Sequence, residues 1–326
     1  MNAVDHNNVV IFDDRGIPSI MCRFVRPKDT EEVPAVFKIG DKVADAIYIS
    51  KYPNIVIDGR AYSMPMADPT VNITFDEAVQ ACRCKGLGWH LMTAVEYEYL
   101  LNQSREKGTM PHGNTDWGKD YYHNDEQGKV SNLGRTYTGT GPVTWNHDHT
   151  PYGVSDLNGN VWEWLAGLRI KDGVIEFIPD NKAASPYCDL SKDSAEWQQA
   201  ETSKGPVRAN VECGEITITD AVAADDYEPD YDGARIEELE VELSEIPQVL
   251  KDLGIILDKR AEEEGKTYVY FDATEGEYMP LRGSAFDSSS NSGPSALLLI
   301  NPRSNSSDYI GFRSAFYEVN GKLITE

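Results

Sequence analysis

The clearest pattern of apolar and polar positions predicts two helices, and each opens with the same capping signal. Thr74 with Glu77 begins a helix that runs through Cys84, and Thr93 with Glu96 begins one that runs through about Arg105. In a capping box, the threonine hydroxyl and the glutamate carboxylate each bond a backbone N–H group that the first helical turn leaves free. The two helices are therefore predicted from local chemistry alone.

A period of two appears near the C-terminus, where Leu297 and Leu299 alternate with Ala296, Leu298 and Ile300. An extended strand would direct the first pair to one face and the other three to the opposite face. A short apolar run is also typical of a strand buried on both faces, so both interpretations stay open on pattern alone. The flanking serines, asparagines and prolines favour loops on either side, and hence an exposed second face.

Shorter patterns predict further strands. Residues 9–12 and 20–24 suggest a small N-terminal β segment within 1–42, and residues 47–52 suggest a strand at the start of the main domain, 43–326. Arg169 to Phe177 predicts a hairpin with an Asp-Gly turn. Residues 106–150 lack periodicity and predict long ordered loops.

The character of the chain changes over residues 181–266, which we interpret as an inserted segment or subdomain. It contains an acidic run at 225–232 and a helical pattern at 234–259 that Pro247 and Gly254 interrupt. The acidic run is most simply a solvated loop.

Composition narrows the function classes. The chain has 326 residues, 10% aromatic and 40% hydrophobic, which is typical of a globular protein. Its formal charge of -24 opposes binding to nucleic acid and to anionic membranes. No apolar run is long enough to span a bilayer, and the first ten residues lack the features of a signal peptide, so we expect synthesis in the cytoplasm and no membrane insertion. Its five cysteines lack CxxC spacing and are expected to be buried free thiols.

Three short patterns admit a functional interpretation, and each has a simpler one. His147-Asp148-His149 has no third ligand nearby and is interpreted as solvated loop residues. Glu228-Pro229-Asp230 resembles the calcium-dependent sugar motif of C-type lectins, but it falls in the acidic insertion. Trp162 and Trp164 could form a carbohydrate platform, although core packing is favoured.

Residues 152–164, with the sequence YGVSDLNGNVWEW, closely resemble the signature of the formylglycine-generating-enzyme (sulfatase-modifying factor) family. Residues 73–78 and 89–99 resemble that family's two-helix segment, and 281–284 with 310–313 resemble its C-terminal strands. The resemblance covers most of residues 46–316 outside the insertion. It implies an α+β fold of the C-type-lectin-like type, formylglycine-generating-enzyme subtype.

The enzymes of that family use a pair of cysteines near the C-terminus to bind copper and oxidise a substrate cysteine. This chain has no cysteine after Cys213. We therefore expect a protein that is not an enzyme, with no catalytic residues and no cofactor. Asn160 matches a position of a calcium site in relatives, but its partner ligands are not identifiable, so no metal is predicted.

The segment 282–313 is similar to the variable region of proteins diversified by diversity-generating retroelements, in which adenine-directed rewriting changes chosen codons within a constant frame. The frame here is Arg-Gly-Ser, then residues 290–293, 297, 299 and 303–306, then Ile-Gly-Phe-Arg. The resemblance implies that Leu297, Leu299, Ile310, Gly311 and Phe312 are a fixed core. It also implies a set of diversified, ligand-binding positions: Ala285, Phe286, Asp287, Ser288, Pro294, Ser295, Ala296, Leu298, Ile300, Asn301, Pro302, Ser307, Asp308 and Tyr309. Phe286, Leu298, Ile300 and Tyr309 would be apolar anchors, with Asp287 and Asp308 at the rim.

Residues 8–16 and 46–52 are similar to structural proteins of gut bacteriophages that carry such regions. These resemblances imply a non-enzymatic protein of a phage or prophage particle that binds a protein or glycan receptor on a target cell surface, with an oligomer possible. Two alternatives stay open: a formylglycine-type oxidase, and a fixed structural virion protein.

Overall fold

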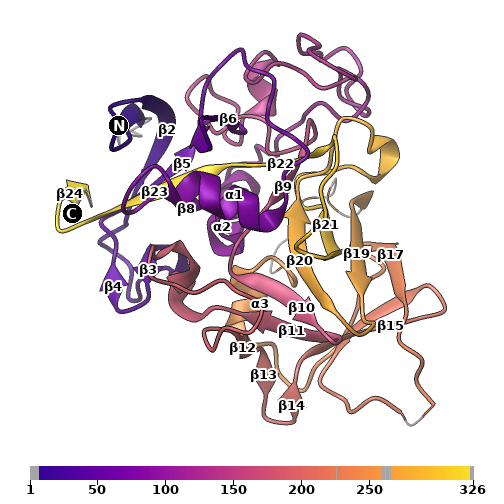
Figure 1. Cartoon of the computed structure of the whole chain (residues 1–326). Helices are drawn as coiled ribbons and strands as arrows, with labels where there is room; N and C mark the ends of the chain where they lie inside the picture. The colour runs from indigo at the N-terminus through magenta and orange to yellow at the C-terminus, as the bar shows by residue number, and fades with distance from the viewer. Residues whose placement is uncertain (1–6, 225, 258–260, 262–263, 265, 324–326) are drawn as a thin grey trace.

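The fold contains a six-stranded sheet and a twelve-stranded sheet, and the helices α1 (Phe75–Arg83) and α2 (Ala94–Lys107) lie near the centre of the view in Figure 1. The structure is a computed structural model that describes residues 7–224, 226–257, 261, 264 and 266–323. Within these residues, three two-stranded ribbons complete the fold. They are β3 (Lys38–Ile39) with β4 (Lys42–Val43), β6 (Ile55–Ile57) with β7 (Arg60–Tyr62), and β13 (Glu201–Thr202) with β14 (Gly205–Pro206).

The six-stranded sheet joins the two ends of the described chain. Its path is β1 (Asn7–Phe12), β2 (Pro18–Val25), β5 (Ala46–Ser50), β23 (Ser314–Val319) and β24 (Lys322–Leu323), with β8 (His90–Leu91) paired to β23. The strands predicted from residues 9–12, 20–24 and 47–52 are confirmed. Since β2 pairs with β5, the N-terminal hairpin extends the same sheet that receives the C-terminal strand.

The twelve-stranded sheet carries the C-terminal segment in its interior. Its path is β17 (Tyr231–Arg235), β19 (Tyr268–Asp272), β21 (Leu297–Asn301), β20 (Glu277–Arg282), β10 (Leu168–Lys171), β11 (Val174–Phe177), β15 (Arg208–Glu212), β16 (Glu215–Thr219) and β18 (Glu240–Glu242). Three short strands join it from the side: β9 (Trp162–Trp164), β12 (Gln198–Gln199) and β22 (Ile310–Phe312). The predicted hairpin is β10–β11, and Asp172 and Gly173 both have positive φ, as its tight turn requires.

Both helices begin where the capping boxes predict. Helix α1 (Phe75–Arg83) follows Thr74 and α2 (Ala94–Lys107) follows Thr93, and in each the reciprocal hydrogen bonds of the box are formed. The α2 helix ends on Gly108 in the left-handed conformation, which glycine adopts without strain. Of the predicted loop region 106–150, residues 106–107 belong to α2, and the rest is loop except for the 3-10 turn Val143–Trp145.

The predicted helix over residues 234–259 is wrong. The described part of this stretch contains the end of β17, the strand β18 and only a short helix, α3 (Gln248–Asp252). Pro247 stands at the N-cap of α3, and Gly254 follows it with positive φ, so these residues confine the helix to five positions. Residues 258–260, at the end of the predicted helix, lie outside the described residues.

The core has two large parts. In one, Leu100 and Leu101 of α2 belong to the same buried cluster as Ile47 of the first sheet and Phe271 of the second. In the other, Trp164 packs against Phe75 of α1, with ring centroids 6.1 Å apart. Trp162 and Trp164 are both buried, so the prediction of core packing is confirmed.

Some polar and sulfur positions differ from expectation. Cys22, Cys82 and Cys188 are buried and free, but Cys84 is half-buried and Cys213 is exposed. His147 and Asp148 are buried instead of solvated, because the His147 ring accepts a hydrogen bond from the Val154 N–H and Asp148 accepts two from Thr150. None of the helices described is long and apolar enough to cross a membrane.

Candidate ligand-binding surface

Buried ion pairs hold both ends of the 282–313 segment. At its start, Arg282 donates to the Glu98 carboxylate at 3.1 Å and to the Gly254 carbonyl at 3.1 Å. At its end, Arg313 donates through Nε to Glu163 at 2.6 Å, with a second bond from Nη2. Both arginines are at most 2% exposed. An ion pair of this kind fixes its backbone neighbours because either charge would be costly to bury alone.

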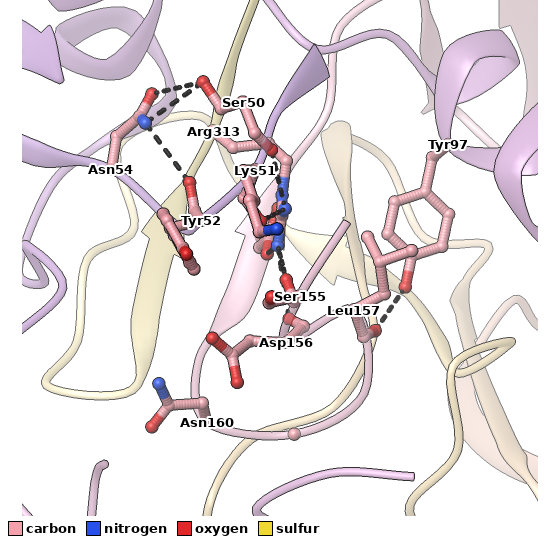
Figure 2. Close-up of polar contacts among 12 residues, drawn as sticks. Ser50, Lys51, Tyr52, Asn54, Tyr97, Ser155, Asp156, Leu157, Asn160 and Arg313 are labelled. Atoms are coloured by element: carbon pink, nitrogen blue, oxygen red, sulfur yellow. Dashed lines mark hydrogen bonds and ion pairs between the residues drawn. The ribbon is translucent and has the colours of Figure 1, made fainter. Parts of the chain in front are cut away.

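Arg313 also gathers four backbone carbonyls around its guanidinium group. It donates to Ser50 and Ser155 at 3.0 and 3.1 Å, and to Lys51 and Asp156 at 3.4 and 3.2 Å (Figure 2). Ser50 ends β5 of the first sheet and Lys51 follows it, whereas residues 155–156 belong to the YGVSDLNGNVWEW motif. One side chain therefore joins the end of the segment to two distant parts of the chain.

The same motif supports the start of the segment. Gly159 N–H donates to the Gly283 carbonyl at 2.6 Å, and the Tyr97 hydroxyl lies 2.7 Å from the Leu157 carbonyl and 2.8 Å from the Pro294 carbonyl. Figure 2 shows Tyr97 directed at Leu157. Gly283 has φ +90, and a Cβ there would lie 2.5 Å from the Leu157 carbonyl oxygen. The segment is thus fixed by hydrogen bonds and by a close backbone contact.

The alternation predicted for residues 296–300 is confirmed inside the strand. Leu297 and Leu299 of β21 are buried in the core with Val269 and Phe271, whereas Leu298 and Ile300 are half-buried on the opposite face. The register places Leu298 beside Tyr270 on that face.

Five of the fourteen predicted outward positions are not outward. Ala285, Phe286, Pro294, Ser295 and Ala296 are buried. Ala285 and Ala296 pack in the Trp164 core, and Ser295 bonds Glu264 beneath the surface. Ala296 precedes β21, so the strand period does not govern it.

The other nine positions reach the surface to different extents. Asp287 and Pro302 are exposed, while Ser288, Leu298, Ile300, Asn301, Ser307, Asp308 and Tyr309 are half-buried. Although Asp287 reaches the surface, partial loss of hydration raises the pKa of its carboxyl, and the nearby Asp308 carboxylate adds to this effect. The fixed positions Leu297, Leu299, Ile310, Gly311 and Phe312 are all buried, as predicted.

Aromatic side chains from outside the segment complete this face, and the sequence alone did not identify them. Trp117 is 59% exposed and meets the Phe286 ring edge-on, with centroids 5.0 Å apart. The Tyr122 hydroxyl donates to the Ser290 carbonyl at 2.9 Å. Burial raises the pKa of the Tyr270 hydroxyl, which hydrogen-bonds the Asn291 side chain. Clustered aromatics in a loop without periodicity, at 117 and 121–122, were the available signal.

The Asn160 side chain is already committed to loop structure. Its Oδ1 accepts from the Thr136 N–H at 2.8 Å, and its Nδ2 donates to the Thr136 carbonyl at 3.1 Å. Among the described residues, no three His, Cys, Asp or Glu side chains are arranged to hold a metal ion. Asn160 therefore has a structural role in joining residues 136 and 160.

Comparison with known proteins assigns the central part of the chain. Residues 51–210 match the family model described as "Sulfatase-modifying factor enzyme 1-like domain". This part of the chain, about half of its length, is therefore similar to a sulfatase-modifying factor enzyme 1-like domain. The match covers both capped helices and the YGVSDLNGNVWEW motif, so the predicted family resemblance and the α+β, C-type-lectin-like fold are confirmed.

One curated relative of this domain is the formylglycine-generating enzyme of Mus musculus, which is 36% identical over 105 residues. The match covers 30% of this chain and 27% of the mouse enzyme, so it spans about a quarter of that relative's length.

Solved structures with some similarity include three proteins. The Major Tropism Determinant U1 variant is 13% identical with a TM-score of 0.32, over 84% of this chain and half of that one. PvdO from Pseudomonas aeruginosa is 14% identical with a TM-score of 0.38, over 95% and 98% of the two chains. Treponema denticola variable protein 1 is 12% identical with a TM-score of 0.36, over 95% and 99%.

The buried carboxyl of Asp156 should give the stability of the protein an unusual dependence on pH. Burial raises the pKa of Asp156 to about 6. The hydrogen bond from the Gly139 N–H and the positive charge of Arg313 lower this pKa but do not outweigh burial. A carboxyl with a raised pKa in the folded state favours folding at low pH and loses that contribution as pH rises through 6. Asp156→Asn keeps an acceptor for Gly139 and tolerates the positive φ at this position.

We expect Asp156→Asn to exceed the parent in free energy of unfolding by roughly 2–3 kcal/mol at pH 8, and by much less at pH 4. Urea unfolding at both pH values measures this difference. Curves of stability against pH that stay parallel for the two proteins would exclude a protonated Asp156.

Proposed function

We propose that this chain is a non-enzymatic ligand-binding protein that displays a variable C-terminal segment, residues 282–313, on its C-type-lectin-like scaffold. The observation that carries the proposal is the pair of buried ion pairs, Arg282–Glu98 and Arg313–Glu163, at the two ends of that segment. Because the backbone is held at both ends and by Leu297 and Leu299, side chains between them can change without changing the fold. Recognition would then vary while stability does not.

The state of the cysteines supports a binding role over thiol oxidation. Burial raises the pKa of Cys188 to about 11 and that of Cys22 to about 12, which disfavours the thiolate needed for copper ligation or nucleophilic attack. The segment that resembles the active-site region of the family contains no cysteine at all.

The ligand in this proposal is a protein or glycan receptor on a target cell surface, and the chain belongs to a phage or prophage particle. The half-buried Leu298, Ile300 and Tyr309 would supply apolar contact, with Asp287 and Asp308 at the rim. The particle assignment rests on the resemblance of residues 8–16 and 46–52 to phage structural proteins.

Deep sequencing of codons 282–313 in the source population, with the flanking DNA, tests the proposal. Substitutions confined to the surface positions, beside a near-identical template repeat and a reverse transcriptase gene, are expected. An invariant segment without a template would instead indicate a binder of fixed specificity or a structural virion protein, whose assembly would respond to changes at Leu298 and Ile300.

If the scaffold is rigid, two neighbouring positions of β21 should respond very differently to the same substitution. Ile300→Asn is expected to alter the free energy of unfolding by no more than about 1 kcal/mol, because the side chain is half-exposed at the end of the strand. Its matched control, Leu299→Asn, places an amide in the core and should cost several times more. Equal losses, measured by urea unfolding, would contradict a tolerant outer face.

A further inference from the structure

A cavity of about 320 Å³ lies beside residues 282–313 and shares residues 292–294 with that segment. It is lined by the C-terminal end of α2, by residues 110–112 and 122–123, by His149, by Lys266 and Thr267, and by residues 292–294. Its size is at the small end of the range for small-molecule sites, about 300–1,000 Å³. The cavity is therefore large enough for one compact ligand.

Three of the six histidines of the chain meet in this cavity. The rings of His112 and His123 stack face to face, with centroids 3.6 Å apart and planes 6° apart. The His149 ring meets His112 edge-on at 5.7 Å. The imidazole nitrogens of these three histidines are therefore the main groups with which a ligand in the cavity could form hydrogen bonds.

The partners of these rings determine which nitrogen carries the proton. The Nδ1 atoms of His112 and His123 face the carboxylates of Glu126 at 3.0 Å and Asp120 at 3.1 Å, and His149 Nε2 faces the Met110 carbonyl at 3.0 Å. Carboxylate and carbonyl oxygens only accept hydrogen bonds, so each of these nitrogens must donate. In the neutral form of an imidazole, the second ring nitrogen is then an acceptor.

The carboxylates of Asp120 and Glu264, which line the cavity, already accept hydrogen bonds from other groups of the protein. Asp120 accepts from the Gly113, Tyr122 and His123 N–H groups as well as from the His123 ring. Glu264 accepts from Arg105, Ser295 and the Ala261 N–H. A carboxylate offers about four acceptor positions, so neither residue has a strong site left for a cationic ligand.

Lys266 supplies a donor at the mouth of the cavity. Its side chain is exposed, lies over the Tyr122 ring at 5.9 Å, and makes no ion pair with any residue of the described chain. The walls thus combine imidazole nitrogens, an exposed ammonium donor and an aromatic ring. Because the rings of His112 and His123 are parallel, their nitrogen lone pairs do not point to a common centre. Accordingly, the described residues contain no group of three His, Cys, Asp or Glu side chains that could hold a metal ion.

We propose that this cavity binds a neutral, polyhydroxylated ligand, a single sugar residue. Its hydroxyl groups would donate to the free ring nitrogens of His112, His123 and His149 and accept from Lys266, while its apolar face packs on Tyr122. The site is built from residues outside the diversified positions except Pro294. It therefore stands whether or not the segment 282–313 varies.

Titration of the isotopically labelled full chain with galactose, mannose, fucose and N-acetylglucosamine, followed by the imidazole C–H signals in NMR, tests this site. Binding of any of these sugars should shift the signals of His112, His123 and His149 and leave those of the other histidines unchanged. His112→Phe and His123→Phe keep the ring stack and remove the acceptor, so each should weaken binding about tenfold, the effect of one hydrogen bond.

Matched variants separate binding from structure. His123→Gln retains an acceptor and should restore part of the affinity that His123→Phe loses, which a purely structural role would not produce. Lys266→Met should weaken binding, whereas Lys204→Met, in the exposed β13–β14 turn, should not.

Two results would overturn the proposal. One is the absence of imidazole shifts with all four sugars at about 50 mM, a concentration that reveals even millimolar affinity. The other is a response to methylammonium without any response to the sugars, since it would show a cation site.

Discussion

Arg313→Ala is expected to lower the free energy of unfolding by about 3–5 kcal/mol, the cost of leaving a buried charge without its partner. Glu163 is 1% exposed and would keep its carboxylate in the core. Four carbonyls, of Ser50, Lys51, Ser155 and Asp156, would also lose their donor (Figure 2). Urea unfolding at pH 7 measures the loss.

Arg303→Ala is the matched control for this variant. Arg303 also pairs with a buried glutamate, Glu277, but Arg169 bonds the same carboxylate at 2.6 Å and remains after the substitution. We expect a loss of about 1–2 kcal/mol there. The double variant Arg313→Met with Glu163→Gln should recover part of the loss of Arg313→Ala, because no charge stays buried. A loss below that of Arg303→Ala would refute the role of Arg313 as the main anchor of the segment.

Gly113→Ala is expected to cost at least about 3 kcal/mol, although φ at this position is not in the left-handed region. A Cβ there would lie 1.7 Å from the Asn158 carbonyl oxygen, and a Cβ at Gly159 would lie 2.1 Å from the Asn114 carbonyl oxygen. The backbone of the loop 110–123 therefore crosses the YGVSDLNGNVWEW motif at glycines from both sides. Since both obstacles are backbone atoms, the two segments would have to separate.

Gly16→Ala is the control for Gly113→Ala, because Gly16 has φ +76 and open space where the Cβ would stand. It isolates backbone strain and should cost only about 1 kcal/mol. Thermal unfolding ranks the two variants. Gly113→Ala should also shift the His112 and His123 NMR signals, since the Gly113 N–H bonds Asp120, the partner of His123. Equal stability losses in the two variants would exclude the close crossing.

The elements that were correctly predicted depend on interactions between near neighbours in the sequence. The boxes at Thr74 and Thr93 are closed by glutamates three residues away, and the Asp172–Gly173 turn requires only the backbone freedom of its own residues. The alternation of Leu297 and Leu299 with Leu298 and Ile300 holds because strand geometry sets it. Such signals do not depend on what the rest of the chain does.

Pattern was misleading where distant segments decide burial. Ala296 and Ser295 match the outward set by sequence, yet they lie before β21 and are covered by the Trp164 core and by Glu264. The residues around 234 match a helical pattern, but in the structure they form β17, which pairs with β19, a strand that lies far along the chain.

The two capped helices, the β10–β11 hairpin, the alternation along β21 and the resemblance of residues 51–210 to the sulfatase-modifying factor family could all be read from the sequence. Three features became visible only in the folded chain: which aromatic rings flank residues 282–313, which positions of that segment reach the surface, and that His112, His123 and His149 share one cavity. The difference depends on how far apart along the chain the interacting residues are. Caps, turns and strand alternation are closed by neighbours along the chain, whereas a cavity wall or a buried ion pair such as Arg313–Glu163 joins residues 150 positions apart and forms only when the whole chain has packed.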